Sequence, residues 1–304
     1  MYSRGGFLED FKSAFSRPNN AHVQLIIINA VLFLAIAIVN VIMDMAKADV
    51  GVLGYIALPS NFDVYIVRPW TIITYMFTHV GIWHILMNML VLYWFGRILI
   101  DYLGSDKLTA VYILGGLGGG ILYMLAYNFV PLFRNEVAGA ILFGASAGVL
   151  GVVAAAATLV PNYTVVLMFI GPVKIKYIAL FYVVLSFIQS TGSNAGGEIA
   201  HLGGALMGFL YVKQLQKGND YGNWITRFLN FIKSFFVPSS NIKVSYKKTK
   251  KSKSNSKGSA TTTTTSTSSH NQEEIDAILD KISEKGYESL SKEEKQKLFN
   301  ASNK

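Results

Sequence analysis

The chain has 304 residues, of which 52% are hydrophobic and only 15% are charged, and its mean hydropathy is +0.38. Soluble domains carry about 25% charged residues, so this composition excludes an ordinary soluble protein and, outside local segments, a disordered one. Cysteine is absent, which excludes a disulfide framework, a thiolate metal site and a cysteine nucleophile. We therefore expect an all-α protein that crosses a membrane several times.

Six apolar stretches are long enough to be candidate membrane-spanning helices, each of which needs ~20 residues. They are residues 23–43, 81–100, 108–130, 144–160, 173–190 and 199–213. The last stretch is short and rich in glycine, so we expect it to begin inside the bundle. The sequence thus predicts a polytopic six-transmembrane-helix bundle.

The segment 44–80 is too long and too apolar for a plain turn between the first two spans. It contains Pro59 and Pro69, and Trp70 is the kind of residue that anchors a chain at the membrane interface. We expect a structured outer loop with short interfacial helices.

Basic residues predict the orientation, because cytoplasmic segments are enriched in Lys and Arg. The outer loops would hold only Lys47, Arg68 and Arg134, whereas residues 217–257 hold ten Lys and Arg against one Asp. We expect an integral multi-pass protein of a bacterial inner (plasma) membrane with both termini cytoplasmic. The basic segment should contact anionic lipid, and no nucleic acid is expected because no reader motif accompanies it.

Four segments follow from this composition: a cytoplasmic N-terminal segment (1–22), the six-helix membrane domain (23–216), a basic and Ser/Thr-rich linker (217–270), and a cytoplasmic C-terminal tail (271–304). In the tail, Ile275, Ile278 and Ile282 recur at helical spacing, and Ser291 with Glu294 is a capping pair that opens a second helix ending near Phe299. The tail is a small helical hairpin or is partly disordered.

Polar residues within the bundle region are candidate functional residues. They are His79, His84, Asn88, Ser146 and His201, and Asn88 shares a helix face with His84 because it follows four residues later. Taken singly, each has a structural explanation, since a membrane serine usually bonds to its own helix and a lone histidine is often a packing residue.

The depths of three of these residues favour a shared site. At 1.5 Å per residue, His84, Ser146 and His201 each lie roughly 20 Å above the inner ends of their helices. That level is roughly 10 Å below the outer edge of the hydrocarbon layer. Separate burial would cost roughly 1–3 kcal/mol for each unpaired group, so one hydrated site is expected.

The chemistry that fits this site is acyl transfer by an activated hydroxyl. Ser146 would be the nucleophile, and His201 the general base that later protonates the leaving amine. Glu198 is expected at the mouth of its helix, away from this level, so a Ser–His dyad is predicted rather than a triad. His84, Asn88 and the N–H of Ser146 would donate to the oxyanion.

Three sequence motifs together resemble the rhomboid family of intramembrane serine proteases over about residues 20–216. They are His79-x4-His84-x3-Asn88, Gly144-Ala145-Ser146 and Ala200-His201-x2-Gly204-x3-Gly208. The resemblance implies a protease domain at 23–216 that cleaves peptide bonds within or next to transmembrane segments of membrane proteins, without metal or cofactor. Its partners would be such substrates and the lipid bilayer.

The resemblance also assigns roles to individual residues. Ser146 and His201 would be catalytic, and His84 and Asn88 would surround the oxyanion. His79 would hold the outer loop. Gly144, Gly204 and Gly208 would be structural, and the last two would allow the close approach of two helices.

The sequence departs from the family pattern at three places. Ala147 stands where the family often has glycine, and the pair Trp70-Thr71 stands where it usually has Trp-Arg. Leu150 replaces an aromatic residue that often stacks on the base histidine. We expect another ring, from Tyr182 or Phe187, to hold His201 instead.

Two other functions remain open. A non-catalytic rhomboid-like protein that binds membrane helices would be expected to lose the serine or the base, and both are present. A metal-dependent intramembrane hydrolase could use His79, His84 and His201 as zinc ligands. That hypothesis leaves Ser146 and Asn88 without a role.

Overall fold

The computed structural model describes residues 13–48, 51–168, 170–236, 274–282 and 289–302. The chain divides into two compact units, Met1–Ser240 and Asn241–Lys304, and each is described by itself. The lysine-rich part of the predicted linker, residues 247–257, lies outside the described residues.

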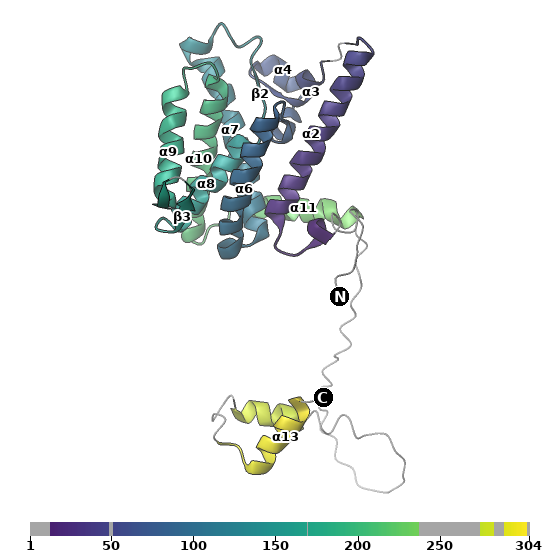
Figure 1. The fold of residues 1–304 in the computed structure, drawn as a ribbon, viewed down its shortest axis with the longest axis vertical. Helices are drawn as coiled ribbons and strands as arrows, with labels where there is room; N and C mark the ends of the chain where they lie inside the picture. The colour runs from purple at the N-terminus through teal and green to yellow at the C-terminus, as the bar shows by residue number, and fades with distance from the viewer. Residues whose placement is uncertain (1–12, 49–50, 169, 237–273, 283–288, 303–304) are drawn as a thin grey trace, which may run out of the picture. The chain divides into compact units, whose positions relative to one another are not determined.

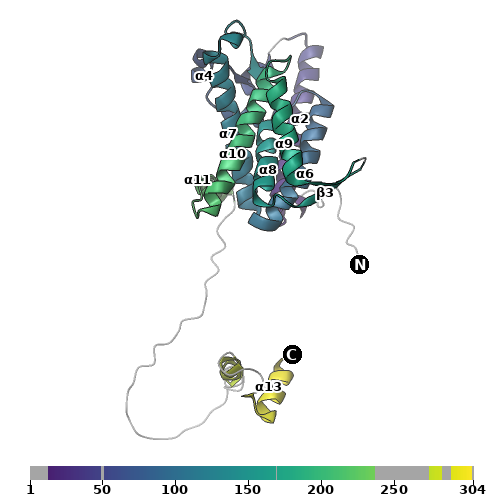
Figure 2. The ribbon, with the colours of Figure 1, turned by 90° about the vertical axis from the view of Figure 1, so that its left-hand side faces the viewer.

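The first unit is a helical bundle in which every predicted apolar stretch is a helix (Figure 1, Figure 2). Helices α7, α8 and α10 pack on one another, α2 packs on α6 and α7, and α9 packs on α8 and α10. Their bounds are α2 (Ala21–Met45), α6 (Ile82–Leu103), α7 (Ser105–Phe129), α8 (Ser146–Leu159), α9 (Ile175–Gln189) and α10 (Ala195–Gln216).

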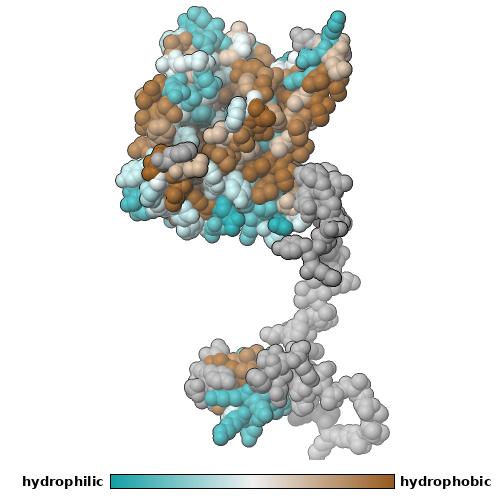
Figure 3. Space-filling model, viewed as in Figure 1, coloured by the Kyte–Doolittle hydropathy of each residue, from teal (hydrophilic) through white to brown (hydrophobic). Residues whose placement is uncertain are grey.

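Three of the described helices, α2, α6 and α7, are long and apolar enough to cross a membrane by length and composition. Helices α8 and α9 are apolar but shorter. Figure 3 shows hydrophobic residues over the flanks of this unit and hydrophilic residues toward its two ends. A polytopic membrane protein agrees with these features, while the count of six spans and the orientation of the termini stay predictions.

The helix that begins inside the bundle is α8, not the last helix as expected. Its 14 residues extend about 21 Å, and a short strand and a glycine turn precede it. The last helix, α10, has 22 residues and begins at Ala195 rather than near residue 199. Its glycine-rich start is helical because it packs against α7, where Gly196 lies against the ring of Tyr123, and tertiary packing overrides the low helix propensity of glycine.

The loop between α2 and α6 is structured, as predicted. It contains α3 (Val52–Ile56), β1 (Leu58–Pro59), α4 (Phe62–Val67), α5 (Thr71–Thr74) and the 3-10 helix η1 (Tyr75–Phe77), and a second 3-10 helix, η2 (Pro131–Phe133), follows α7. Strand β1 pairs antiparallel with β2 (Ile141–Leu142), which leads into the start of α8. The hydroxyl of Tyr112 on α7 donates to the carbonyl of Met76 at 2.8 Å. The loop is therefore fixed both to α7 and to the strand that precedes Ser146.

Two elements at the opposite end of the bundle were not predicted (Figure 1). One is the hairpin of β3 (Thr164–Leu167) and β4 (Gly171–Lys174), between α8 and α9. The other is α11 (Asn223–Phe236), so the first part of the predicted linker 217–270 is a helix. The apolar residues of this segment recur at helical spacing among polar ones, a signal that the overall basic composition concealed.

The second unit contains helical residues 274–282 and α13 (Lys292–Ser302). The predicted capping pair is present, because Ser291 N–H donates to Glu294 at 2.7 Å and Glu294 N–H donates to the Ser291 hydroxyl at 3.3 Å. Lys281 joins the two helices through an ion pair with Glu294 at 2.9 Å. Two helices thus form where they were expected, and the second continues three residues beyond Phe299.

Glycines bring α8 and α10 into backbone contact. A Cβ added at Gly204 would collide with the carbonyl oxygen of Ala147, and one added at Gly208 would collide with the carbonyl oxygen of Gly151. No other residue type fits between the two helices at these positions. This contact sets the distance between the residues that α8 and α10 carry.

Replacing Gly204 with alanine should push α8 and α10 apart and destabilise the fold. Overpacking of this kind typically costs 1–3 kcal/mol, roughly a few degrees in the thermal midpoint. The matched control is Gly139→Ala, since an added Cβ there meets no atom within 4 Å. Thermal unfolding in detergent measures both variants, and equal midpoints for the two would contradict the packing described here.

Candidate active site

Ser146 is the first residue of α8, and the turn before it is built around Gly144. Gly144 has φ +124°, which other residues rarely adopt, and its N–H donates to the carbonyl of Tyr75 at 2.9 Å. An added Cβ at Gly144 would lie 2.7 Å from Cε1 of His84. Gly144 thus allows the His84 ring to lie directly beside the turn that carries Ser146.

His79 lies beneath the same turn. Its Nε2 accepts a hydrogen bond from the N–H of Ala145 at 3.3 Å, and its side chain is buried. Burial, and next the neighbouring His84, lower the pKa of His79 to about 4, so the ring is neutral near pH 7 and can accept this bond. His79 therefore contacts the backbone of the turn, as expected of a residue that holds a loop.

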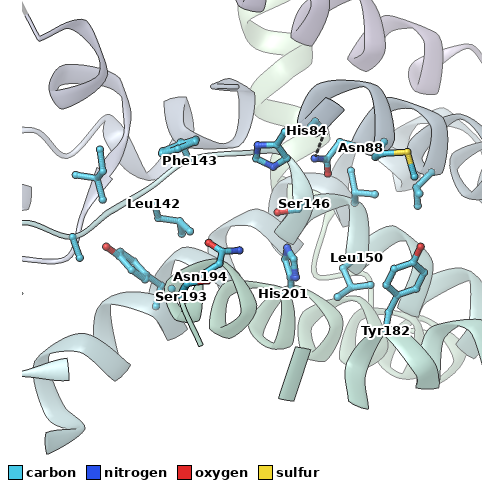
Figure 4. Close-up of a pocket in the computed structure, with 18 of the residues that line it drawn as sticks. His84, Asn88, Leu142, Phe143, Ser146, Leu150, Tyr182, Ser193, Asn194 and His201 are labelled. Atoms are coloured by element: carbon cyan, nitrogen blue, oxygen red, sulfur yellow. Dashed lines mark hydrogen bonds between the residues drawn. The ribbon is translucent and has the colours of Figure 1, made fainter. Parts of the chain in front are cut away.

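His201 reaches the level of Ser146 from α10. It precedes Gly204 by three residues, about one helical turn, and Gly204 packs on Ala147, the neighbour of Ser146. Figure 4 shows Ser146 between the rings of His84 and His201. Three separate helices thus bring these polar side chains together.

The predicted residues share one cavity of about 840 Å³. His84, Asn88, Ser146 and His201 all contribute to its wall, together with apolar residues such as Leu150 (Figure 4). This volume is in the range of ligand sites in proteins. No hydrogen bond joins the Ser146 and His201 side chains among the bonds of the described residues, and in enzymes without substrate such contacts are often long.

A carboxylate lies beside the imidazole, contrary to the sequence prediction. Glu198 Oε2 is 3.1 Å from Nδ1 of His201, and the hydroxyl of Ser186 on α9 is 3.2 Å from the same nitrogen. The prediction failed because α10 begins at Ala195, so Glu198 is already in the first helical turn, on the same face as His201. The spacing of three residues, which puts Glu198 and His201 on one face, was the available signal.

The predicted aromatic support for His201 is absent from the described residues. No ring contact joins His201 to Tyr182 or Phe187; Tyr182 lines the cavity and Phe187 is exposed. The polar groups of Glu198 and Ser186 hold the ring instead. Sequence reasoning missed Ser186, which stands next to Phe187 on α9.

Asn88 and the first turn of α8 carry hydrogen-bond donors in the part of the cavity next to Ser146. The Asn88 amide donates one N–H to the carbonyl of His84 at 2.8 Å (dashed in Figure 4), which leaves its second N–H for another acceptor. Ser146 is at the first position of α8, where an N–H has no partner within the helix. These donors are of the kind that stabilise an oxyanion.

The alternative of a histidine-ligated metal centre finds no ligand set in the part of the chain that the structure describes. No three His, Cys, Asp or Glu side chains there are grouped so that they could hold a metal ion. His79 instead uses Nε2 for the Ala145 amide, and His201 uses Nδ1 for Glu198 and Ser186.

Residues 67–217 match the Rhomboid domain family, and residues 266–304 match a family of unknown function, DUF6576. The chain is 30% identical over 161 residues to RHOMBOID-like protein 12, mitochondrial, of Arabidopsis thaliana, with 50% of this chain and 48% of the relative covered. It is 33% identical over 191 residues to Rhomboid protein 1, mitochondrial, of Saccharomyces cerevisiae, with 57% and 52% covered. The chain thus spans about half the length of these curated relatives.

These relatives correct the expected location. The similar proteins are named as mitochondrial, and one of Arabidopsis thaliana, Rhomboid-like protein 16, is named as chloroplastic, with 24% identity over 233 residues, or 71% of this chain and 70% of the relative. They point to an organellar membrane, so the prediction of a bacterial inner membrane is wrong, whereas the orientation of the termini stays a prediction. The prediction relied on the distribution of Lys and Arg, which reports sidedness rather than the identity of the membrane.

His79 should make stability fall as the pH falls. An unfolded histidine binds a proton near pH 6.5, whereas folded His79 stays neutral to about pH 4, so the unfolded state binds more protons between these values. The contribution of neutral His79 to the free energy of unfolding is fully present above pH 6.5 and is lost as the pH falls toward 4. In this range the free energy of unfolding falls by up to about 1.4 kcal/mol per pH unit.

The variant His79→Gln keeps an acceptor for the Ala145 amide but does not titrate. Its thermal midpoint should depend less steeply on pH between 6.5 and 4 than that of the native chain. Parallel curves for the two proteins would show that His79 is not the titrating group.

Proposed function

The chain belongs to the rhomboid family, and from that premise we propose that it is a serine endopeptidase that cleaves peptide bonds within or next to transmembrane segments of membrane proteins. The observation that supports this proposal best is the shared cavity. Ser146 from α8 and His201 from α10 face it together with His84 and Asn88 from α6.

In the proposed reaction, Nε2 of His201 removes the proton of the Ser146 hydroxyl while Oγ attacks the substrate carbonyl carbon. The tetrahedral oxyanion accepts hydrogen bonds from the Ser146 N–H, from Asn88 and from His84. His201 then gives the proton to the leaving amine, and an acyl group remains on Ser146. Water, deprotonated by the same imidazole, releases the acyl group and restores the serine.

Glu198 and Ser186 would orient the base in this scheme. A proton on Nδ1 of His201 can be donated to the carboxylate at 3.1 Å and to the hydroxyl at 3.2 Å. The tautomer with the proton on Nδ1 leaves Nε2 unprotonated, as a general base requires. Glu198 would also stabilise the imidazolium that forms when Ser146 is deprotonated.

The substrate would have to enter as an unwound segment. A helical backbone hides its carbonyl carbons, so the cavity must receive an extended stretch of chain with a small residue at the cleaved bond. Entry past α9 is favoured because this helix buries few residues against the bundle. Its buried residues are Ile175, Ala179 and Ser186. The rest of α9 is partly buried or exposed, and Tyr177 and Phe181 are among its exposed residues.

The variants Ser146→Ala and His201→Ala test the proposal most simply. Each should lower cleavage of a model transmembrane substrate in liposomes by more than about 10³-fold, because the nucleophile or its base is removed. Ser190→Ala is the matched control, since the Ser190 hydroxyl is exposed and donates only to the carbonyl of Phe187. The control should cleave at the native rate.

Cleavage by Ser146→Ala at the native rate would contradict the proposal. If the native chain cleaved no substrate and Ser146→Ala retained the biological role of the protein, the non-catalytic alternative, a rhomboid-like protein that binds membrane helices, would take its place.

Glu198→Gln separates an orienting role of Glu198 from a structural one. The amide has nearly the shape of the carboxylate but can donate to Nδ1, which would favour the tautomer that cannot accept the Ser146 proton. We expect kcat to fall by about 10²-fold or more while KM changes little.

Glu198→Asp should recover part of that loss, because the carboxylate is kept on a shorter side chain. Ser186→Ala, which removes a neutral partner of the same nitrogen, should have a smaller effect than Glu198→Gln. Near-native kcat in Glu198→Gln would show that the carboxylate only fills space.

A further inference from the structure

Helix α11 (Asn223–Phe236) has two sharply different faces. At 100° per residue, its apolar residues occupy one arc of about 160°, and Asn223, Thr226, Arg227, Asn230, Lys233 and Ser234 occupy the rest. Such a division is typical of a helix that lies between an apolar phase and water.

The bundle covers only part of the apolar arc. Ile225 is 3% exposed, and α11 packs against α7. The neighbouring part of the arc, here called the aromatic face, consists of Trp224, Phe228, Phe231 and Phe235, which are 55%, 56%, 60% and 69% exposed. The rings of Phe231 and Phe235 pack edge to face with centroids 4.9 Å apart. A contiguous aromatic surface of this kind indicates an apolar partner.

The start of α11 is held in place by α7 and α10. Asp220 is paired with Lys107, accepts a hydrogen bond from the Tyr211 hydroxyl at 3.1 Å, and accepts another from the Gly222 N–H at 3.1 Å. Gly222 itself fits closely against Ala110, since an added Cβ would lie 2.6 Å from that methyl group. These contacts make α11 leave α10 in a fixed direction, across the end of the bundle (Figure 1, Figure 2).

The end of the bundle where α11 lies is here called the cationic end. The ends of the helices and of β4 at this end carry basic residues, among them Arg97, Lys107, Lys174, Lys176 and Lys213. The acidic residues there are Asp101, which pairs with Arg97 at 3.3 Å, Asp220, which pairs with Lys107, and Asp106. This charge complements an anionic surface.

The level of α11 along the bundle matches a membrane surface. Helices α6 and α7 are long and apolar enough to cross a membrane, and both have one end at the cationic end. Gly222, directly before α11, lies against Ala110 in the second turn of α7, and α11 packs on α7. Helix α11 therefore lies where the hydrocarbon layer would give way to headgroups.

A second apolar projection lies at the same end. The hairpin β3–β4 extends sideways from the bundle (Figure 2), and Val166, Met168 and Ile170 at its tip are exposed. Lys174, which pairs with Thr164, and Lys176 lie at the base of the hairpin. Two separate elements thus combine exposed apolar side chains with adjacent cations at the cationic end, the combination that interfacial anchors show.

We propose that α11 is a membrane-surface helix whose aromatic face lies at the boundary of acyl chains and headgroups of an anionic leaflet at the cationic end. The aromatic rings enter the apolar layer, and Arg227 and the basic residues around it face the anionic headgroups. The proposal concerns how the chain sits on its membrane and does not depend on proteolytic activity.

The absence of cysteine permits a direct test on the full chain, because each introduced cysteine is the only thiol. Phe231→Cys and Phe235→Cys place a spin label on the aromatic face, and Asn230→Cys and Ser234→Cys are matched controls on the exposed polar face. The four proteins are reconstituted in phosphatidylcholine vesicles with or without phosphatidylglycerol. Collision with oxygen, which is soluble in lipid, is then compared with collision with a water-soluble nickel chelate.

In vesicles with phosphatidylglycerol, the ratio of oxygen to nickel collisions should be at least about fivefold higher for the labels on the aromatic face than for the controls. That difference should shrink in phosphatidylcholine alone. Unchanged thermal midpoints show that each variant is folded, and the position of Phe235 near the end of α11 makes that variant the less disruptive of the two.

Equal ratios for all four labels would overturn the proposal, because the aromatic face would then lie in water. If the ratios of the labels on the aromatic face were the same with and without phosphatidylglycerol, an anionic leaflet would not be the partner of that face. Dipolar coupling between Phe231 labels that disappears on dilution with unlabelled protein would assign the aromatic face to a second copy of the chain instead.

Discussion

The backbone contact between α8 and α10 is the constraint on which the candidate site depends. Gly204 and Gly208 allow α10 to rest on the carbonyl groups of Ala147 and Gly151, so no side chain separates the two helices. Since Ser146 precedes Ala147 and His201 lies one turn before Gly204, this contact fixes the distance between the hydroxyl and the imidazole. Glycine is a poor helix former in isolation, but tight packing within an apolar bundle compensates for that weakness.

Several polar groups of the site pair with one another or with the backbone, although Nδ1 of His79 is buried without a hydrogen-bond partner among the described residues. Nδ1 of His201 is shared by Glu198 and Ser186, the Asn88 amide returns to the carbonyl of His84, and His79 accepts from the Ala145 amide. A buried polar group without a partner costs about 1–3 kcal/mol, so these pairings allow a polar cavity to persist in a hydrophobic bundle. They also hold the imidazole and the serine turn in position before any substrate arrives, which is the arrangement that favours catalysis.

Much of this arrangement could be predicted from the sequence, because polar residues in long apolar stretches are conspicuous and helix geometry converts their positions into depth. The same reasoning failed where tertiary contacts decide the outcome. Glu198 was expected at a helix mouth, but packing of Gly196 on Tyr123 extends α10 toward its N-terminus and brings Glu198 onto the face of His201. Helix α11 was overlooked because its apolar residues are interspersed in a basic segment, where average composition hides a helical period.

The proposed activity requires that the imidazole of His201 activates the hydroxyl of Ser146. Covalent labelling with a fluorophosphonate, which reacts with activated serines and requires no substrate, measures this activation directly when the labelled residue is identified by mass spectrometry. We expect that the native chain is labelled at Ser146 and that His201→Ala abolishes the labelling while the fold is retained. Labelling of Ser146 at the same rate in the native chain and in His201→Ala, or no labelling of the folded native chain, would contradict it.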